Sequence, residues 1–182
     1  MNKTAIITGA SRGIGKASAY KLAEDGFIPV INYRTHKAEA EKIAAETGGF
    51  AICADVSDRI AVDNMIRETM KKTGRIDVLI NNAGISVSGL FMYITPEQEE
   101  LIWKVNVQGT YNCTRSALPF MINAKSGKII NISSMWGQTG ASCEVHYSAS
   151  KAAIIGFTKA LAKELGPSGI NVNCIAPGVI LT

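Results

Sequence analysis

Apolar and polar positions follow two alternating patterns along this chain. Short apolar runs of strand length recur between longer segments in which apolar residues repeat every three to four positions. Runs of the first kind predict buried strands, and segments of the second kind predict amphipathic helices. The predicted strands cover residues 4–8, 27–31, 50–54, 76–80, 128–132 and 170–175.

The helical segments fall between these strands. They cover residues 14–25, 36–47, 58–72, 95–124 and 147–166. Ser57 or Asp58 is expected to cap the third helix, and the long fourth helix is expected to bend near Gly109. Regular alternation of strand and helix predicts an α/β fold of Rossmann type, with a doubly wound parallel sheet and helices on both faces. We expect a single dinucleotide-binding domain over residues 1–182.

Composition narrows the possible partners. The 182 residues are 47% hydrophobic, which suits one domain with a sizeable core. The net charge is +4, and the 19 basic residues are dispersed among 15 acidic ones, so a nucleic acid is not an expected partner. Neither an apolar run of membrane-spanning length nor a signal peptide is recognisable, so we expect a cytoplasmic protein without a membrane partner. Four widely spaced cysteines with two histidines predict no metal site.

A glycine cluster follows the first predicted strand and opens the first helix. Its spacing in Thr8–Gly15 is Gly-x-x-x-Gly-x-Gly rather than the commoner G-x-G-x-x-G. Glycines at this point allow a tight turn and let a pyrophosphate approach the backbone N–H groups of the helix N-terminus. The residues predicted to contact the cofactor here are Gly9, Ser11, Arg12, Gly13, Ile14 and Gly15.

The end of the second strand indicates which dinucleotide binds. An NAD site would normally place an acidic residue here for the ribose hydroxyls, but Asn32–Thr35 contains none. Arg34 and Arg12 instead suit a 2′-phosphate, which guanidinium groups bind well. We therefore predict NADP(H), with Tyr33 beside Arg34 in the same site. The alternative is that both arginines are solvated surface residues.

Tyr147 and Lys151 are the strongest candidates for catalysis. Residues four apart on a helix share one face, so the ammonium is expected to lie close to the phenol. A cation roughly 4 Å away would favour the phenolate by about 4 kcal/mol and lower the tyrosine pKa by about three units, before any desolvation cost. Such a phenol would suit proton transfer to a developing alkoxide. Ser134, with Ser133 as its rival, would hold the substrate oxygen, and His146 is expected to be a packing or surface residue.

With these motifs together, the chain resembles the short-chain dehydrogenase/reductase family, and within it most resembles the 3-oxoacyl-[acyl-carrier-protein] reductases of fatty acid synthesis. The likeness runs from Lys3 to the last residue. It implies that Asn106 completes a catalytic tetrad with Ser134, Tyr147 and Lys151. Further positions that match the family's cofactor contacts are Asp55, Val56, Asn82, Ala83, Gly84, Tyr147, Lys151, Pro177, Gly178 and Ile180.

The resemblance also implies a mechanism. Hydride would pass from the nicotinamide C4 to a ketone carbon, and Tyr147 would protonate the oxygen while Ser134 hydrogen-bonds to it. Lys151 would lower the tyrosine pKa and bind the nicotinamide ribose. Asn106 would support a water that leads protons to Lys151.

The chain departs from the family at its end. Family members usually continue beyond the position of Thr182 through a substrate-covering helical segment and a seventh strand, so we expect a C-terminally incomplete fold. The resemblance implies a homodimer through the helices at 95–124 and 147–166, or a homotetramer. The expected substrate is a ketone, with an acyl group on acyl carrier protein as the candidate, for which Lys125 and Lys128 would supply basic surface. The alternatives are a sugar or polyol dehydrogenase of the same family and a non-catalytic dinucleotide-binding protein.

Overall fold

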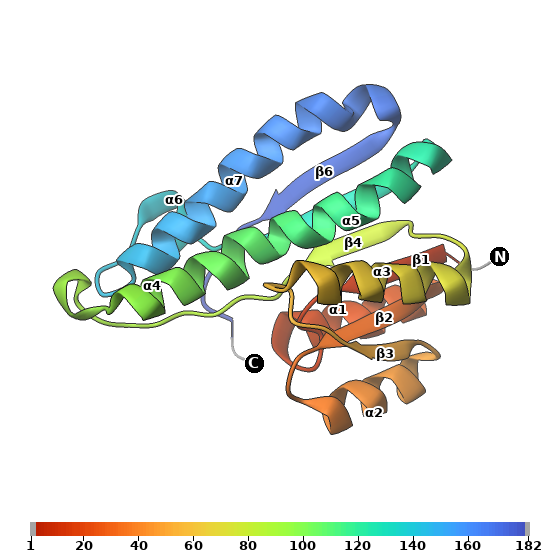
Figure 1. Ribbon diagram of the computed structural model, residues 1–182, viewed down its shortest axis with the longest axis horizontal. Coiled ribbons are helices and arrows are strands. Elements are labelled where there is room, and N and C mark those ends of the chain that lie inside the picture. The colour runs from red at the N-terminus through yellow and green to blue at the C-terminus, as the bar shows by residue number, and fades with distance from the viewer. Residues whose placement is uncertain (1–2, 181–182) are drawn as a thin grey trace.

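The computed structural model describes residues 3–180 and has one parallel six-stranded sheet (Figure 1). The strand order is β3-β2-β1-β4-β5-β6, so the chain begins at the centre, winds to one edge, returns and winds to the other. The strands are β1 (Lys3–Ile7), β2 (Phe27–Tyr33), β3 (Phe50–Cys53), β4 (Val78–Asn81), β5 (Gly127–Ile132) and β6 (Ile170–Ile175). The predicted doubly wound sheet is confirmed.

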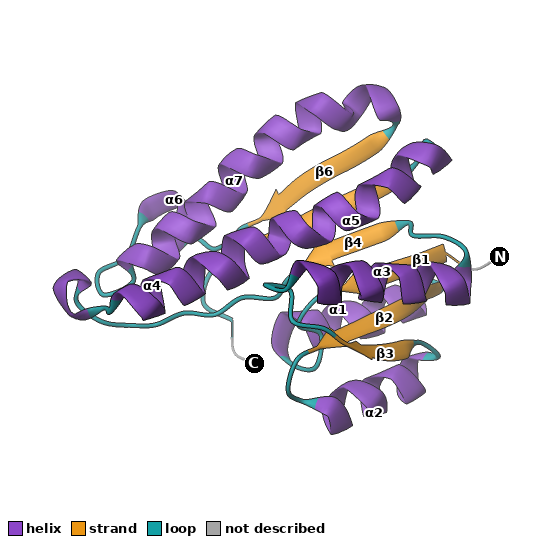
Figure 2. Cartoon of the chain, in the orientation of Figure 1, coloured by secondary structure: helices purple, strands orange, loops and turns teal. Residues whose placement is uncertain are grey.

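Helices cover both faces of the sheet (Figure 2). The helices are α1 (Gly13–Glu24), α2 (Lys37–Thr47), α3 (Arg59–Thr73), α4 (Pro96–Ile102), α5 (Gly109–Ala124), α6 (Trp136–Thr139) and α7 (Val145–Leu165). Single 3₁₀ turns lie at Phe91–Tyr93 and Gly166–Ser168. The sequence pattern did not reveal α6 or the first of these turns, because segments this short carry no measurable periodicity.

The core has two layers because successive side chains on a strand point to opposite faces of the sheet. On β1, Ile6 belongs to a cluster with residues of α3, α5 and α7. Its neighbours Ala5 and Ile7 belong to a second cluster with residues of α1 and α2. Both layers are apolar, which explains why these strands read as continuous hydrophobic runs rather than as alternating ones.

The segment predicted as one helix over 95–124 contains a π-helical stretch at Trp103–Gln108 between α4 and α5. The irregularity therefore precedes Gly109, which itself has ordinary helical angles of φ −59° and ψ −45°. Gly109 is needed for another reason: a Cβ there would lie 2.7 Å from Val56 Cγ2. The helix thus approaches the loop after β3 more closely than any side chain would allow.

The start of α3 resolves which residue caps it. Asp58 accepts hydrogen bonds from the backbone N–H groups of Ile60 (2.8 Å) and Ala61 (3.2 Å). The N–H and hydroxyl of Ser57 donate to Asp55 Oδ1 instead of capping the helix. Of the two candidates from the sequence, Asp58 is the cap. Among residues 3–180, no helix combines the length and apolar character needed to cross a membrane.

Candidate active site

The loops that follow the carboxyl ends of the strands enclose a cavity of about 530 Å³. In parallel α/β sheets ligands bind at this end, where the strand order reverses. Every residue predicted from the sequence to contact cofactor or substrate lines this cavity, except Gly15 and Asn106, which lie behind its wall. Residues that the sequence analysis did not single out also line it, among them His36, Ile85 and Ser86.

The glycine turn after β1 forms a close-packed cradle at one side of this cavity. Gly9 and Gly13 have φ angles of +62° and +56°, which favour glycine. A Cβ on Gly15 would lie 2.6 Å from the Asn82 side-chain nitrogen. That amide donates to the carbonyls of Thr8 (2.8 Å) and Gly9 (3.2 Å), so the segment after β4 holds the turn in shape.

This cradle fits a pyrophosphate. The turn leads into the N-terminus of α1, a twelve-residue helix without a side-chain cap, so its first backbone N–H groups lack partners within the helix. Unpaired N–H groups and the helix dipole attract an anion, and positive-φ glycines let it come close to the backbone. These are the features that a dinucleotide requires of the protein.

Arg34 lies where the adenosine ribose is expected. Its Nη1 is 3.4 Å from Asp55 Oδ2, an ion pair between side chains that are 55% and 34% exposed. Burial raises the pKa of Asp55, but the hydrogen bonds from Ser57 and the charge of Arg34 outweigh it, so the pKa lies below its ordinary value. No acidic residue lies next to Arg34 in the sequence, but the structure brings Asp55 beside it from the loop after β3.

Tyr147 differs from the sequence-based expectation. Burial raises the pKa of the Tyr147 phenol, the charge of Glu144 adds to the rise, and a hydrogen bond with Ser134 opposes it. Lys151 does not lower this pKa, because its Nζ lies 5.6 Å from the ring centroid and donates to the Ile132 carbonyl at 2.8 Å. The expected downward shift is therefore wrong for this structure.

The pKa of Lys151 is itself shifted far from its ordinary value. Its side chain is buried between α7 and the end of β5, and this burial lowers the pKa of its ammonium to about 8. The charge of Cys174 opposes the shift only in part. A lysine with this pKa exchanges protons readily near neutral pH.

Asn106 lies within the π-helical stretch and is 1% exposed. Its Oδ1 accepts from the N–H of Ile85 (2.8 Å), while its Nδ2 donates to the Ile85 carbonyl (2.9 Å) and to Ser150 Oγ (3.0 Å). A Cβ on Gly84 would lie 3.3 Å from both Asn106 Oδ1 and Lys151 Nζ. Gly84 therefore keeps open the space between these two side chains.

The structure separates the two serines after β5. The Ser133 hydroxyl donates to the backbone carbonyl of Lys151 at 2.7 Å, so it serves to anchor α7. Ser134 Oγ accepts from the N–H of Trp136 at 3.2 Å, and the Ser134 side chain also forms the hydrogen bond with Tyr147 that lowers the pKa of its phenol. Both serines line the cavity, but the Ser133 hydroxyl is bound to the backbone, so Ser134 remains the candidate for holding the substrate oxygen. The hydroxyls of Ser133 and Ser150 donate to the backbone carbonyls of Lys151 and Tyr147. Such a supporting role could not be predicted from the sequence.

His146 packs rather than facing the cavity. Its ring stacks on Phe91 with centroids 5.0 Å apart, and its Nδ1 is 3.8 Å from Glu99. His146 does not line the cavity that Tyr147 lines. This agrees with the expectation that it is a packing residue.

A parallel sheet of this order, a glycine cradle at the first helix, and a half-buried Tyr147 beside a buried Lys151 in the same cavity together define a dinucleotide-binding oxidoreductase. The short chain dehydrogenase family matches residues 3–182. The chain belongs to that family, whose members use a nicotinamide dinucleotide.

Individual relatives agree with this assignment. The chain is 42% identical to the 3-oxoacyl-[acyl-carrier-protein] reductase FabG of Staphylococcus aureus, over 100% of this chain and 76% of that protein. It is 44% identical to the 3-oxoacyl-[acyl-carrier-protein] reductase of Synechocystis, over 99% of this chain and 75% of that one. A solved structure of a putative short-chain alcohol dehydrogenase from Sinorhizobium meliloti superposes with a TM-score of 0.94 at 35% identity, covering 99% of this chain and 73% of that chain.

Proposed function

We propose that this protein catalyses the NADPH-dependent reduction of a ketone to a secondary alcohol, as a 3-oxoacyl-[acyl-carrier-protein] reductase in fatty acid synthesis. The observation that supports the proposal is that Ser134, Tyr147 and Lys151 line the same cavity as the glycine cradle. The names of the two reductase relatives support the choice of substrate.

In this proposal the bound nicotinamide supplies the hydride, and the side chains manage the proton. Ser134 donates a hydrogen bond to the carbonyl oxygen, and Tyr147 transfers its proton to that oxygen as negative charge develops. A raised pKa keeps Tyr147 protonated at neutral pH, the form that reduction needs. Lys151 would hold the nicotinamide ribose and return a proton to Tyr147, and Asn106 would order the water that leads protons to Lys151.

The cofactor would lie along the full length of the cavity. The glycine cradle would hold the pyrophosphate, Asp55 and Val56 the adenine, and Tyr33 with the two arginines the phosphorylated ribose. Asn82, Ala83 and Gly84 would border its middle, and Pro177, Gly178 and Ile180 the nicotinamide. All but Gly15 of the proposed contact residues line the cavity.

Replacing Arg34 with alanine is expected to lower kcat/KM for NADPH by about tenfold to a hundredfold while changing the value for NADH little. The reason is that a charged hydrogen bond to the 2′-phosphate contributes about 1.5–3 kcal/mol. Initial rates with NADPH and with NADH give the ratio of the two kcat/KM values. The exposed Arg67 on α3 provides a control substitution far from the cavity. An unchanged NADPH/NADH ratio in the Arg34→Ala protein would show that this arginine does not select the phosphate.

The substrate class can be tested directly. The protein is expected to oxidise NADPH with acetoacetyl thioesters and to show no reaction with glucose and NADP⁺. The reverse result would favour a sugar or polyol dehydrogenase, and cofactor binding without either activity would favour a non-catalytic dinucleotide-binding protein.

The two lysines expected to meet an acyl carrier protein lie away from the cavity. Lys125 and Lys128 lie at the start of β5, whereas Ser134 follows its end. Within one chain these lysines therefore do not border the cavity.

We also propose a cytoplasmic homodimer, or a tetramer built from it, that forms through α5 and α7. These helices pack against each other with Tyr111 and Phe157 ring centroids 4.5 Å apart. Ile122 on α5 is 45% exposed, and the proposed partner would cover it. Light scattering that shows only monomer at micromolar concentration would contradict this.

A further inference from the structure

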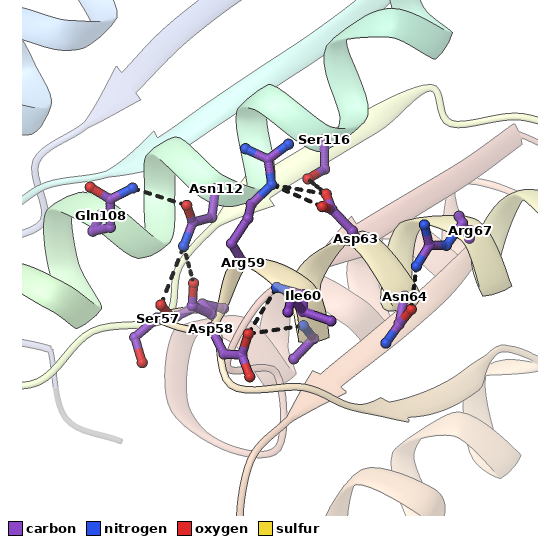
Figure 3. Close-up of polar contacts among 12 residues, drawn as sticks. Ser57, Asp58, Arg59, Ile60, Asp63, Asn64, Arg67, Gln108, Asn112 and Ser116 are labelled. Carbon is purple, nitrogen blue, oxygen red and sulfur yellow. Dashed lines mark hydrogen bonds and ion pairs between the residues drawn. The ribbon is translucent and has the colours of Figure 1, made fainter.

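Asn112 connects helix α5 to the turn that follows β3 (Figure 3). Its side chain is 3% exposed, and its Nδ2 donates to the Val56 carbonyl at 3.0 Å. The Ser57 carbonyl lies at 3.5 Å from the same nitrogen. Gln108, one helical turn earlier, donates to Asn112 Oδ1 at 3.0 Å and so fixes which way the amide faces.

The turn that Asn112 holds carries two of the proposed cofactor contacts. Asp55 and Val56 both line the cavity. Within the turn, the N–H and hydroxyl of Ser57 donate to Asp55 Oδ1 at 2.9 and 2.7 Å. The other carboxylate oxygen of Asp55 faces Arg34. The position of this turn therefore sets where Asp55, and through it Arg34, stands.

The contact between α5 and the turn is close as well as polar. Gly109 brings the helix against Val56 without room for a side chain, as described above. A buried carbonyl that loses its donor is costly, so the turn would be expected to shift if the Asn112 amide were removed. Packing and hydrogen bonding thus both fix the turn relative to α5.

We infer that Asn112 is a positioning residue for the adenosine half of the dinucleotide. It touches no part of the cavity itself and acts through the backbone of Val56 and Ser57. This inference rests on the cofactor assignment in the proposed function. It does not depend on which ketone is reduced.

The test is to replace Asn112 with alanine and measure the binding of 2′,5′-ADP by calorimetry. Losing one hydrogen bond of about 1.4 kcal/mol corresponds to about tenfold weaker binding. The kcat/KM for NADPH is expected to fall by a similar factor. With reduced nicotinamide mononucleotide, which lacks the adenosine half, the rate is expected to stay within about twofold of the wild-type rate, since the change would not reach the nicotinamide end.

Ser116→Ala is the matched control. Ser116 lies one turn further along α5, and its hydroxyl donates to Asp63 of α3 rather than to the cofactor turn. The Ser116→Ala substitution is expected to leave 2′,5′-ADP binding unchanged. The inference is overturned if Asn112→Ala binds 2′,5′-ADP as tightly as Ser116→Ala does, or if the rates with NADPH and with the mononucleotide fall equally.

A second variant guards against a folding defect. Gln108 is exposed, so Gln108→Ala should fold while removing the brace on the Asn112 amide. The Gln108→Ala substitution is expected to weaken 2′,5′-ADP binding by roughly twofold to threefold, which is a part of the energy of one hydrogen bond. No weakening would count against the inference.

Binding also separates this inference from the proposed function. If the wild-type protein binds 2′,5′-ADP but reduces no ketone, the proposed function fails while this inference is still tested by binding. If it prefers 5′-AMP, the same comparison is made with that ligand.

Discussion

Replacing Tyr147 with phenylalanine is expected to lower the rate of ketone reduction by about 10²–10⁴-fold, the usual contribution of general acid catalysis. The ring would remain in place, so its edge contact with Trp136, at a centroid distance of 6.2 Å, would persist. NADPH affinity should change by no more than a few fold, because Tyr147 is one of many proposed cofactor contacts and its ring would remain in place. Single-turnover kinetics together with a cofactor titration would separate the two effects.

Tyr93→Phe is a suitable control for that substitution. Tyr93 is 72% exposed and lies outside the cavity, so losing its hydroxyl should leave the rate unchanged. If the Tyr147→Phe protein retained a tenth or more of the wild-type rate while binding NADPH normally, another group would have to supply the proton.

The second large effect concerns Lys151, whose replacement by methionine is expected to abolish reduction yet stabilise the protein at neutral pH. Burial lowers the pKa of this lysine from 10.5 to about 8 in the folded state. Below about pH 8 the ammonium is charged in both states, and the folded state bears a cost of about 3 kcal/mol for holding it. Methionine avoids this cost, although the lost bond to Ile132 offsets about 1 kcal/mol.

The sign of this effect depends on pH. Between the folded pKa of about 8 and the ordinary value of 10.5, the unfolded chain binds more protons, so the wild-type protein gains stability as pH rises. The advantage of the methionine variant should therefore be greatest at pH 7 and disappear by about pH 10.5. Urea unfolding of both proteins without cofactor, at several pH values, measures this difference in the free energy of unfolding. Lys159→Met, at an exposed position of α7, controls for the general effect of removing a lysine. A Lys151→Met protein less stable than wild type at pH 7 would contradict the prediction.

The fold could be predicted largely from local patterns. Apolar strands such as 4–8 and 128–132 end at glycine or polar residues, and each leads into a periodic helix, so their order defines the sheet. The spacing of Tyr147 and Lys151 placed both on one face of α7, and both line the cavity. The choice of Ser134 over Ser133 stays a prediction, because both serines follow the end of β5 and both line the cavity.

What the sequence could not supply depends on packing between distant segments. The π-helical stretch around Asn106 adds residues to a turn without disturbing the apolar pattern, so the segment read as regular helix. The direction of the Tyr147 pKa shift depends on burial and on where Lys151 Nζ points, and a spacing of four residues fixes neither. The Asn112 contact joins residues 56 positions apart and had no local signature.

The Arg34–Asp55 pair has a consequence for how an anionic ligand would be received. A long arginine side chain normally loses much of its rotational freedom when it grips a ligand, and here the carboxylate has already restrained it. An arriving phosphate would meet a preordered guanidinium but would also meet the negative charge that preordered it. Discrimination at this position would then be an exchange of one anion for another, so the loss in the Arg34→Ala protein is expected toward the tenfold end of its range.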